Sequence, residues 1–378
     1  MKVALVHDYI KEYGGAERVL ESLHSIYKNA PIYTLLYTPK FLGPHRQRFK
    51  DFDIRTSIVQ YLPFKEKLIS PLRIIAPFLF KMFNFEDFDL IIVSSTGAYI
   101  PNMINKKKAI QVCYCHTPPR YLYGYKTARE WKKNLIFKVL GEIANHFLRI
   151  LDFKAAQNVD LFITNSKNTS LRIKKFYRRD SKVIYPPVVF KNSENYQRPL
   201  EKGEYFLAGG RLARPKNIDL IIKAFAQNGK LLKIFGRDFA GYGDELKKLL
   251  SKKTENIEFL GEVGDGEKIT LMKGSRAYII ASEDEDFGIT PLESMAEGIP
   301  VISYKQGGMI ETVIDGKTGV FFDELTVESL NDAIFRFSKE KFDSKFIREH
   351  ALKFSEDNFK KRIQEFIKNL EKGEKVYA

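Results

Sequence analysis

The sequence predicts an α/β protein with two doubly wound parallel sheets, one in each of two domains. Apolar segments of strand length alternate with helical segments along the whole chain, which is typical of parallel sheets covered by helices on both faces. The 378 residues exceed the roughly 150 residues of an average domain. Pro186 and Pro187 mark a link near the middle of the chain, because proline favours an extended backbone.

The expected elements form one set on each side of this link. Six strands are expected before it, at 2–7, 31–35, 90–95, 109–114, 160–164 and 182–185. Six more are expected after it, at 204–208, 231–235, 256–260, 276–281, 299–303 and 319–322. Helices are expected between them, at 15–27, 141–157, 167–178, 217–227, 243–252, 267–273, 291–297, 308–314 and 327–338.

These sets predict a domain at 1–187 and a second at 188–354, with a polar surface loop at 190–202. A last helix is expected at about 355–378, because Ser355-Glu356-Asp357 resembles a cap before an apolar stripe. Two such domains are expected to face each other across a cleft at the carboxyl ends of their strands, where open α/β sheets bind ligands.

The composition is that of an ordinary globular protein, with 44% hydrophobic and 29% charged residues. Two cysteines, Cys113 and Cys115, are too few for a disulfide-stapled fold and favour a reducing compartment. The first apolar run is too short for a signal peptide, and no run approaches the roughly 20 apolar residues of a membrane-spanning helix. Secretion is therefore not expected.

The positive charge is concentrated in the first half of the chain. Residues 1–187 contain 31 Lys and Arg against 15 Asp and Glu, a net charge of +16. The net charge of the whole chain is +15, so the entire excess lies in this half. Within 60–85, apolar side chains alternate with Lys65, Lys67, Arg73 and Lys81, which suits a segment lying on anionic lipid. A solvated surface is an equal alternative. Nucleic acid is not an expected partner, because no nucleic-acid-binding motif is present.

Two motifs in the first half follow expected strands. Gly14-Gly15 comes after the first strand and opens a helix, so its backbone can approach an anionic ligand closely. His116 follows the strand at 109–114. Taken alone, Gly14-Gly15 is weak evidence for a ligand site. A histidine at a strand end is more often structural than catalytic.

Two motifs in the second half are charged. Arg211 and Lys216 follow Gly209-Gly210, which suits a clamp on a diphosphate; an exposed basic loop is the alternative. Glu285 and Glu293 flank a helix start, where backbone amides can meet an anion and carboxylates can accept hydrogen bonds from sugar hydroxyls. Capping of the helix by acidic residues is the alternative.

In this order the motifs resemble the GT-B glycosyltransferases, and specifically glycosyltransferase family 4. The likeness covers nearly the whole chain and is most specific at Gly210-Arg211 with Lys216 and at Glu285 with Glu293. The other matching residues are Gly14-Gly15-Ala16-Glu17-Arg18, His116, Asn165-Ser166, Tyr185-Pro186-Pro187-Val188, Phe235-Gly236, Gly261 and Gly307-Gly308.

The resemblance implies a retaining transfer from a nucleotide sugar bound mainly by the C-terminal domain, with the acceptor on the N-terminal domain and the last helix packed back on the latter. Arg211 and Lys216 would hold the diphosphate, Glu285 the donor sugar and Glu293 the ribose hydroxyls. The amides around Phe287, Gly288, Ile289 and Thr290 would contact the sugar and phosphate, Gly14 and Gly15 would close over the donor, and His116 would hydrogen-bond the transferred sugar. The catalytic residues would thus be His116, Arg211, Lys216 and Glu285.

No cofactor or metal is expected, because Arg211 and Lys216 supply the positive charge that a metal gives elsewhere. The stretch 112–121 and Gly14–Arg18 look most like bacterial or archaeal mannosyltransferases of surface-polysaccharide assembly. We therefore expect GDP-mannose as donor, a glycan acceptor linked to a lipid, and a cytoplasmic location on the inner face of the cell membrane. A UDP-sugar donor, a GT-B nucleotide-sugar epimerase and a non-catalytic sugar-nucleotide-binding scaffold are the alternatives.

Overall fold

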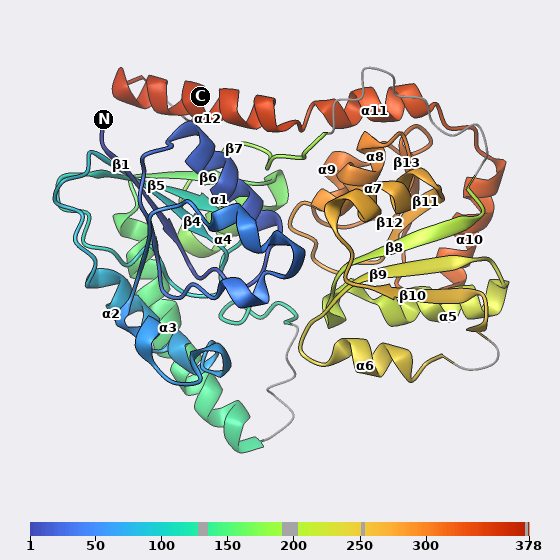
Figure 1. Ribbon diagram of the computed structural model, residues 1–378, viewed down its shortest axis with the longest axis horizontal. Helices are drawn as coiled ribbons and strands as arrows, with labels where there is room; N and C mark the ends of the chain where they lie inside the picture. The colour runs from blue at the N-terminus through green and yellow to red at the C-terminus, as the bar shows by residue number, and fades with distance from the viewer. Residues whose placement is uncertain (128–134, 191–202, 251–253, 375–376, 378) are drawn as a thin grey trace. The chain divides into compact units, whose positions relative to one another are not determined.

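The chain folds into two compact units (Figure 1). Unit 1 comprises Met1–Tyr125, Glu130–Pro187 and Asp357–Ala378, and unit 2 comprises Lys126–Arg129 and Val188–Glu356. The computed structural model describes residues 1–127, 135–190, 203–250, 254–374 and 377. Each unit has its own parallel sheet, which confirms the predicted α/β class with two doubly wound sheets.

The sheet of unit 1 has seven strands in the order β3-β2-β1-β4-β5-β6-β7, all parallel to their neighbours. The strands are β1 Val3–His7, β2 Ile32–Thr34, β3 Ile54–Thr56, β4 Leu90–Ser95, β5 Ile110–Cys115, β6 Leu161–Thr164 and β7 Lys182–Val183. Every residue of β1 and β4 is buried, because both strands are central and helices cover both faces of such a sheet.

Among the described residues, five α-helices accompany this sheet: α1 Gly15–Ile26, α2 Ala76–Lys81, α3 Leu135–Asn158, α4 Lys167–Tyr177 and α12 Glu356–Glu371. Ser166 caps α4 by accepting a hydrogen bond from the Thr169 amide, as a serine N-cap does. The apolar stripe of α12 is buried in the same hydrophobic cluster as β1, through Phe359, Ile363, Phe366 and Ile367. The end of the chain therefore contributes to the core of unit 1.

The sheet of unit 2 has six parallel strands in the order β10-β9-β8-β11-β12-β13. They are β8 Tyr205–Leu212, β9 Leu232–Asp238, β10 Ile257–Gly261, β11 Ser275–Ile280, β12 Val301–Tyr304 and β13 Gly319–Phe322. The order changes direction between β8 and β11, so the carboxyl ends of these two strands form the switch point at which such sheets usually bind ligands.

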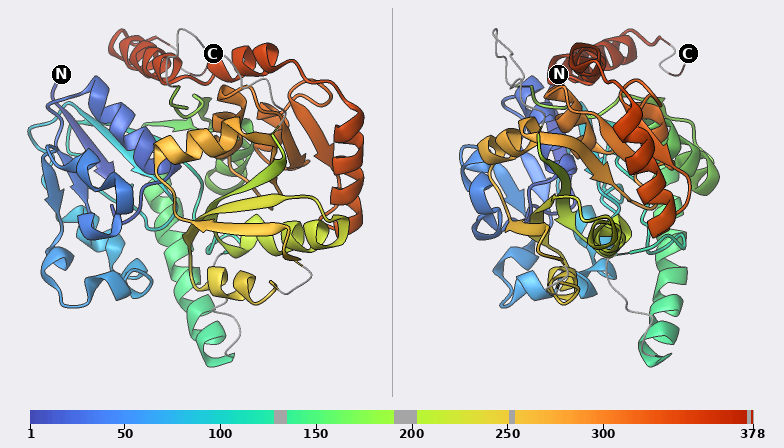
Figure 2. Two further views of the ribbon diagram at one scale, coloured as in Figure 1. Left: turned by 45° about the vertical axis from the view of Figure 1, so that its right-hand side comes forward. Right: turned by 90° about the vertical axis from the view of Figure 1, so that its right-hand side faces the viewer.

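The helices of unit 2 lie on both faces of its sheet (Figure 2). They are α5 Ile218–Asn228, α6 Tyr242–Lys247, α7 Asp265–Lys273, α8 Ile289–Ala296, α9 Met309–Thr312, α10 Val327–Lys339 and α11 Ser344–Leu352. α5 and α10 pack on each other, while α8 contacts α7, α11 and β11. α8, which follows β11, is thus fixed by its packing against α7, α11 and β11.

Four features differ from the sequence prediction. Strand β3 was not expected, and neither were α2 and the short 3-10 turns between Pro39 and Arg73. The helix expected at 243–252 ends at Lys247, and its residues 251 and 252 lie outside the described ranges. All but the first residue of the loop expected at 190–202 also lies outside them.

Candidate active site

Three polar side chains lie at the carboxyl edge of the sheet of unit 1. His7 is the last residue of β1 and is in register with Ser94 on β4. His116 directly follows β5, and β1, β4 and β5 are neighbours in the sheet. Because the carboxyl ends of parallel strands meet at one edge, these three side chains are brought together although 109 residues separate the first from the last.

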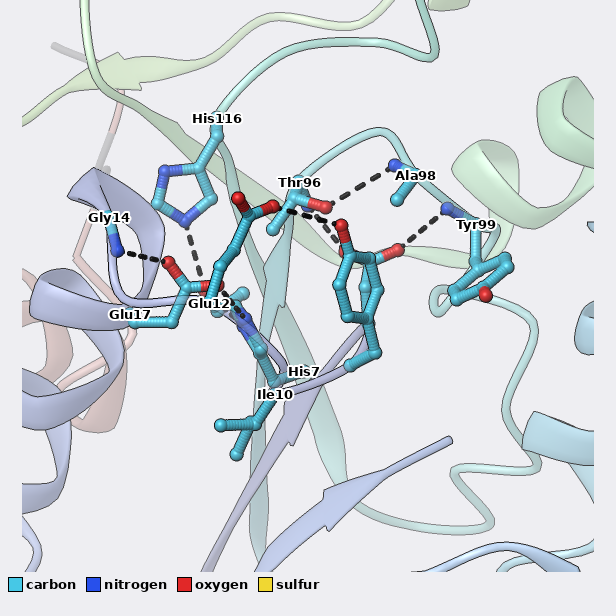
Figure 3. A network of polar contacts seen from close by, with 12 residues as sticks. His7, Ile10, Glu12, Gly14, Glu17, Thr96, Ala98, Tyr99 and His116 are labelled. Atoms are coloured by element: carbon cyan, nitrogen blue, oxygen red, sulfur yellow. Dashed lines mark hydrogen bonds and ion pairs between the residues drawn. The ribbon is translucent and has the colours of Figure 1, made fainter. Parts of the chain in front are cut away.

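Polar contacts join these side chains into a chain that continues to α1 (Figure 3). Ser94 Oγ lies 2.9 Å from His116 Nε2 and 3.1 Å from His7 Nδ1. The other ring nitrogen of His7 lies 3.5 Å from Glu17 Oε1. Glu17 Oε2 accepts a 2.8 Å hydrogen bond from the Gly14 amide, so the predicted Gly14-Gly15 motif is tied to the predicted His116.

This chain of contacts is shielded from water. His7 and Ser94 are 0% exposed, Glu17 is 5% exposed and His116 is 9% exposed. Burial, with a smaller contribution from His7, lowers the pKa of His116 to about 3. This pKa favours the neutral form of His116 at physiological pH.

Asp8 fixes the backbone beside this edge. Its buried carboxyl group accepts hydrogen bonds from the amides of Thr96 and Tyr99, at 2.5 and 2.8 Å. Burial raises its pKa above the ordinary value of an aspartate. Figure 3 shows Thr96 and Tyr99 at the loop that follows β4, so Asp8 holds that loop in place.

In unit 2, the glycine-rich motif ends β8 beside the start of α8. Gly210 has a φ of +103°, and a Cβ atom there would lie 3.6 Å from Thr290 Oγ1. The two predicted motifs, at Gly209–Lys216 and at Glu285–Glu293, therefore meet at this position. The exposed Arg211 has its guanidinium carbon 5.0 Å from the centre of the Phe239 ring.

Lys216 and Glu285 form a direct ion pair, in which Lys216 Nζ donates to Glu285 Oε2. The loop before α5 is fixed to the end of β11 on both sides of the lysine. The Glu283 amide donates to Pro215 O at 2.8 Å, and Asn217 Nδ2 donates to Ala281 O at 2.9 Å. These bonds set the position from which Lys216 reaches Glu285.

The backbone of Glu285 is held by the Gly307-Gly308 pair. The Gly308 amide donates to Glu285 O at 2.9 Å, and a Cβ at Gly307 would lie only 2.3 Å from the same oxygen. Gly288 precedes α8 with a φ of +90°, a conformation that suits glycine. The neighbouring Phe287 is buried against Phe354, so the four residues Phe287–Thr290 have a defined place.

Glu293 is paired with a lysine that the sequence did not indicate. Lys268 Nζ on α7 lies 2.8 Å from Glu293 Oε1 and 3.4 Å from Asp265 Oδ1. Glu293 is 9% exposed. The structure thus places two carboxylates of the motif in two separate lysine pairs.

Tyr278 links the two glutamates and the glycine-rich strand end. Its hydroxyl donates to Gly209 O at 2.7 Å. Its pKa is raised by burial and further by the charges of Glu293 and Glu285. Both carboxylates therefore act on the same buried side chain of β11, which indicates that they lie in one region of unit 2.

Arg214 and the two cysteines are paired or buried within the fold. Arg214, which lies between Arg211 and Lys216, pairs with Glu245, and both cysteines are buried and outside any disulfide. Over the residues that the structure describes, no group of three or more His, Cys, Asp and Glu side chains is arranged to hold a metal ion. Independence of metal stays a prediction.

Sequence reasoning missed Glu17, His7 and Ser94 as partners of His116, and Lys268 as the partner of Glu293. His7 and Ser94 had a signal, because each lies at the carboxyl end of a strand of the same sheet, whereas Glu17 lies within α1. Lys268 had none, since its contact depends on how α7 packs on α8.

Comparison with known proteins gives the family of both halves. Residues 13–190 match the model described as Glycosyltransferase Family 4, and residues 190–361 match the model described as Glycosyl transferases group 1. Together the two matches cover nearly the whole chain.

Curated relatives are similar over much of their length. The alpha-1,3/1,6-mannosyltransferase of Schizosaccharomyces pombe is 26% identical over 84% of this chain and 70% of its own. The human enzyme of the same name is 26% identical over 71% of this chain and 67% of its own.

Solved structures share the fold. Sucrose-phosphate synthase from Thermosynechococcus elongatus superposes with a TM-score of 0.74 at 16% identity, over 99% of this chain and 100% of its own. HepE of Anabaena, solved with UDP and glucose, gives 0.68 at 19% identity, over 97% and 99%. Both units thus have the GT-B type of α/β sheet.

Proposed function

Because the chain belongs to glycosyltransferase family 4, we propose that it transfers mannose from GDP-mannose to a glycan acceptor linked to a lipid. The sugar is supported by the relatives, which are named alpha-1,3/1,6-mannosyltransferases. The choice of a guanine nucleotide and of a lipid-linked acceptor goes beyond what these names support. They are chosen on the resemblance of 112–121 and Gly14–Arg18 to mannosyltransferases of surface-polysaccharide assembly.

The Lys216–Glu285 ion pair beside the start of α8 is the observation that carries the donor site. The Lys216 side chain is 27% exposed and that of Glu285 is 14% exposed, so the pair is open enough for a ligand to enter. A diphosphate would take Lys216 as its counter-ion, together with Arg211, and Glu285 would then accept hydrogen bonds from the sugar hydroxyls.

The positive charge of Lys216 and Arg211 suits the chemistry of the leaving group. When the bond between the anomeric carbon and the diphosphate oxygen breaks, the sugar gains oxocarbenium character and negative charge collects on the diphosphate. A positioned cation stabilises that charge in the transition state. We propose retention of configuration with a donor phosphate oxygen accepting the proton of the acceptor hydroxyl, by analogy with the family.

Glu293 and His116 take the other two proposed contacts with the donor. The Glu293 carboxylate would accept from the ribose hydroxyls in exchange for part of its contact with Lys268. The neutral His116 would hydrogen-bond the transferred sugar, and Gly14 and Gly15 would approach the donor through their backbone. In this proposal unit 2 binds the nucleotide and unit 1 binds the acceptor.

The test is a transfer assay on the full chain with GDP-mannose, GDP-glucose and UDP-sugars, each with and without a lipid-linked glycan acceptor. We expect mannosylated product from GDP-mannose only when the acceptor is present. Product from a UDP-sugar alone would replace the donor, and epimerised nucleotide sugar without acceptor would favour an epimerase. Binding of every donor without turnover would favour a scaffold.

We also propose that unit 1 lies on an anionic membrane at the inner face of the cell membrane. None of the described helices combines the length and apolar character needed to cross a bilayer. Large apolar side chains are nonetheless exposed along α3, at Val139, Leu140, Ile143, Phe147 and Ile150. Figures 1 and 2 show the first half of α3 standing clear of the sheet of unit 1.

A second exposed apolar segment lies before and within α2 and includes Phe64 and Phe78. It is connected to α3 through Tyr121, because the Arg73 guanidinium lies 4.2 Å from the Tyr121 ring centre and Asn145 donates to Tyr121 O at 3.4 Å. Apolar side chains next to basic ones bind anionic lipid through both area and charge.

Sedimentation with vesicles tests the membrane proposal. We expect the protein to sediment with vesicles that contain phosphatidylglycerol at low salt and to be released at high salt. Phe147→Ser is expected to weaken sedimentation, whereas Phe335→Ser, which changes a phenylalanine of unit 2 that is also more than half exposed, is not. Equal loss in both variants, or no sedimentation of the unaltered protein, would contradict the proposal.

A further inference from the structure

Arg73 is a partly buried cation of unit 1 whose charge the fold does not use. Its guanidinium carbon lies 4.2 Å from the centre of the Tyr121 ring. Its Nε atom is buried without a hydrogen-bond partner, and so is the hydroxyl oxygen of Tyr121. Among the described residues, no carboxylate forms an ion pair with Arg73. Such burial costs free energy, so the stacked pair has the features of a site that a ligand completes.

Arg55 offers a comparison within the same unit. Its guanidinium carbon lies 5.4 Å from the centre of the Tyr33 ring, and its Nη2 atom lies 2.8 Å from Asp53 Oδ2. An aromatic ring and a carboxylate thus surround this arginine. At Arg73 the ring is present and the anion is missing. Stacking leaves the edge of a guanidinium free, where two parallel N–H groups fit two oxygens of a phosphate.

The two carboxyl groups whose charges act on Tyr121 do not supply the missing anion. These are Asp8 and Asp152, which are both buried. Burial raises the pKa of Asp8 and raises that of Asp152 to about 7. Asp8 accepts hydrogen bonds from two amides of the loop after β4, and Asp152 accepts one from the Tyr123 hydroxyl. Both carboxyl groups are therefore engaged within the fold.

The stacked pair is fixed to the carboxyl edge of the sheet of unit 1. The Tyr99 hydroxyl, from the loop after β4, donates to Ile69 O at 2.9 Å, four residues before Arg73. Tyr121 follows β5, and its backbone oxygen accepts a 3.4 Å hydrogen bond from Asn145 on α3. The free charge is thus held beside the edge that carries the proposed acceptor site.

Apolar side chains are exposed near both members of the pair. Ile74 and Phe78 follow Arg73 in the chain, and Phe147 lies on α3 two residues after Asn145; each is more than half exposed. An inorganic anion would satisfy the guanidinium and leave these side chains in water. A phosphate attached to a hydrocarbon chain matches both the charge and the apolar surroundings.

We propose that Arg73, stacked on Tyr121, binds the phosphate group of the lipid to which the acceptor glycan is attached. The exposed apolar side chains beside it contact the first part of the hydrocarbon chain. The statement about the acceptor rests on the function proposed above, whereas the binding of a phosphate on a hydrocarbon chain does not.

Calorimetric titration of the full chain with decyl phosphate, below the concentration at which it forms micelles, tests the site without turnover. We expect decyl phosphate to bind, inorganic phosphate to bind more weakly and decanol not to bind. Arg73→Gln is expected to weaken binding of decyl phosphate about tenfold or more, the value of hydrogen bonds to a charged group. Arg55→Gln is the matched control and is expected to bind as the unaltered protein does.

Absence of binding, unchanged affinity in Arg73→Gln or equal loss in both variants would overturn the proposal. Equal affinity for decyl phosphate and inorganic phosphate would overturn its lipid part. If Arg73→Gln does not fold, Arg73→Lys tests the same point, because lysine keeps the charge but lacks the planar fork of the guanidinium. Weaker binding is expected, and unchanged affinity in Arg73→Lys would contradict the proposed contact.

Sedimentation with phosphatidylglycerol vesicles separates the two sources of a lipid phosphate. Arg73→Gln is expected to sediment at low salt nearly as the unaltered protein does, because many apolar and basic side chains contribute to binding of a membrane surface. A loss of vesicle binding as large as the loss for decyl phosphate would assign the phosphate to membrane headgroups and overturn its assignment to the acceptor.

Kinetics test the part that concerns the acceptor. Arg73→Gln is expected to raise the KM for the lipid-linked acceptor about tenfold and to leave the KM for GDP-mannose unchanged. With the same glycan on an uncharged alkyl chain, no difference is expected. An equal increase for the uncharged acceptor would remove the phosphate contact. No turnover by the unaltered protein with either acceptor would instead count against the proposed function, while the titration still decides the phosphate site.

Discussion

In unit 1 the polar side chains at the carboxyl edge of the sheet are closed off from water and joined through imidazole and hydroxyl groups, whereas in unit 2 they are charged, partly exposed and paired with lysines. Buried polar side chains that contact one another are held in place and can orient a group of a ligand. A partly exposed ion pair can exchange its partner for a ligand. The two edges therefore suit two tasks, orientation in unit 1 and binding of a charged group in unit 2.

Replacing Lys216 is the strongest test of the second task. Lys216→Ala removes a cation from the proposed diphosphate site and is expected to lower kcat/KM for GDP-mannose by about 10²–10³. Steady-state transfer kinetics measure this effect. The matched control is Lys223→Ala on α5, whose lysine pairs with Asp219 at the surface; a similar loss there, or a small loss in Lys216→Ala, would contradict the difference between the two edges.

The closed character of unit 1 is tested by Asp152 on α3. This buried carboxyl group accepts a 2.8 Å hydrogen bond from the Tyr123 hydroxyl, and burial raises its pKa to about 7. The folded protein therefore holds a proton that the unfolded chain releases above about pH 3.9. Its contribution to stability is full below that pH and is lost as the pH rises to about 7.

We expect the unfolding free energy of Asp152→Asn, relative to the unaltered protein, to increase between pH 4 and 7 by up to about 1.4 kcal/mol per pH unit. Urea unfolding at pH 5 and pH 8 measures the difference. Asp180→Asn, at an exposed aspartate paired with Lys174, serves as the control. A constant difference between Asp152→Asn and the unaltered protein would show that this carboxyl group is ionised in the fold.

Glu293 and Glu297 allow a matched comparison within unit 2. Glu293 lies within α8 and Glu297 directly follows it. Each pairs with a lysine of α7, Glu293 with Lys268 and Glu297 with Lys273. Glu293→Gln is expected to raise the KM for the donor about tenfold by weakening a hydrogen bond to the ribose. Glu297→Gln is expected to leave the KM unchanged, and equal effects would remove Glu293 from the donor site.

The smallest expected effect is on the pH profile. Since the pKa of His116 is about 3, its ionisation lies outside the range in which an ordinary histidine titrates. His116→Asn is expected to lower kcat but to leave the shape of the curve of kcat against pH between 5 and 8 unchanged. Loss of an ionisation near pH 6.5 in this variant would show that His116 carries a proton during the reaction.

Much of this arrangement follows from the sequence, for physical reasons. The buried central strands were predictable because β1 and β4 are nearly continuous apolar runs. Strand β3 was missed because it has only three residues, none of them buried. α2 was missed because Pro77 lies near its start. In a sequence, a proline indicates the break of a helix unless the helix begins just before it.

The site was predictable as far as neighbours in the sequence determine it. Lys216 and Glu285 were expected together, because both motifs follow strands at the carboxyl edge of one sheet. The pair of Glu293 with Lys268 and the contact of His7 with Ser94 depend on helix packing and on strand order. A single sequence contains neither strand order nor helix packing. It could place His7 and Ser94 at the ends of predicted strands but could not identify them as neighbours, and it gave no sign of Lys268.

Calorimetric titration with GDP-mannose tests the central claim most directly. The account predicts that the full chain binds GDP-mannose without added metal and that Lys216→Ala and Glu293→Gln both weaken this binding, while Lys223→Ala and Glu297→Gln bind as the unaltered protein does. Unchanged affinity in the first two variants would contradict the proposal that this edge of unit 2 holds the donor.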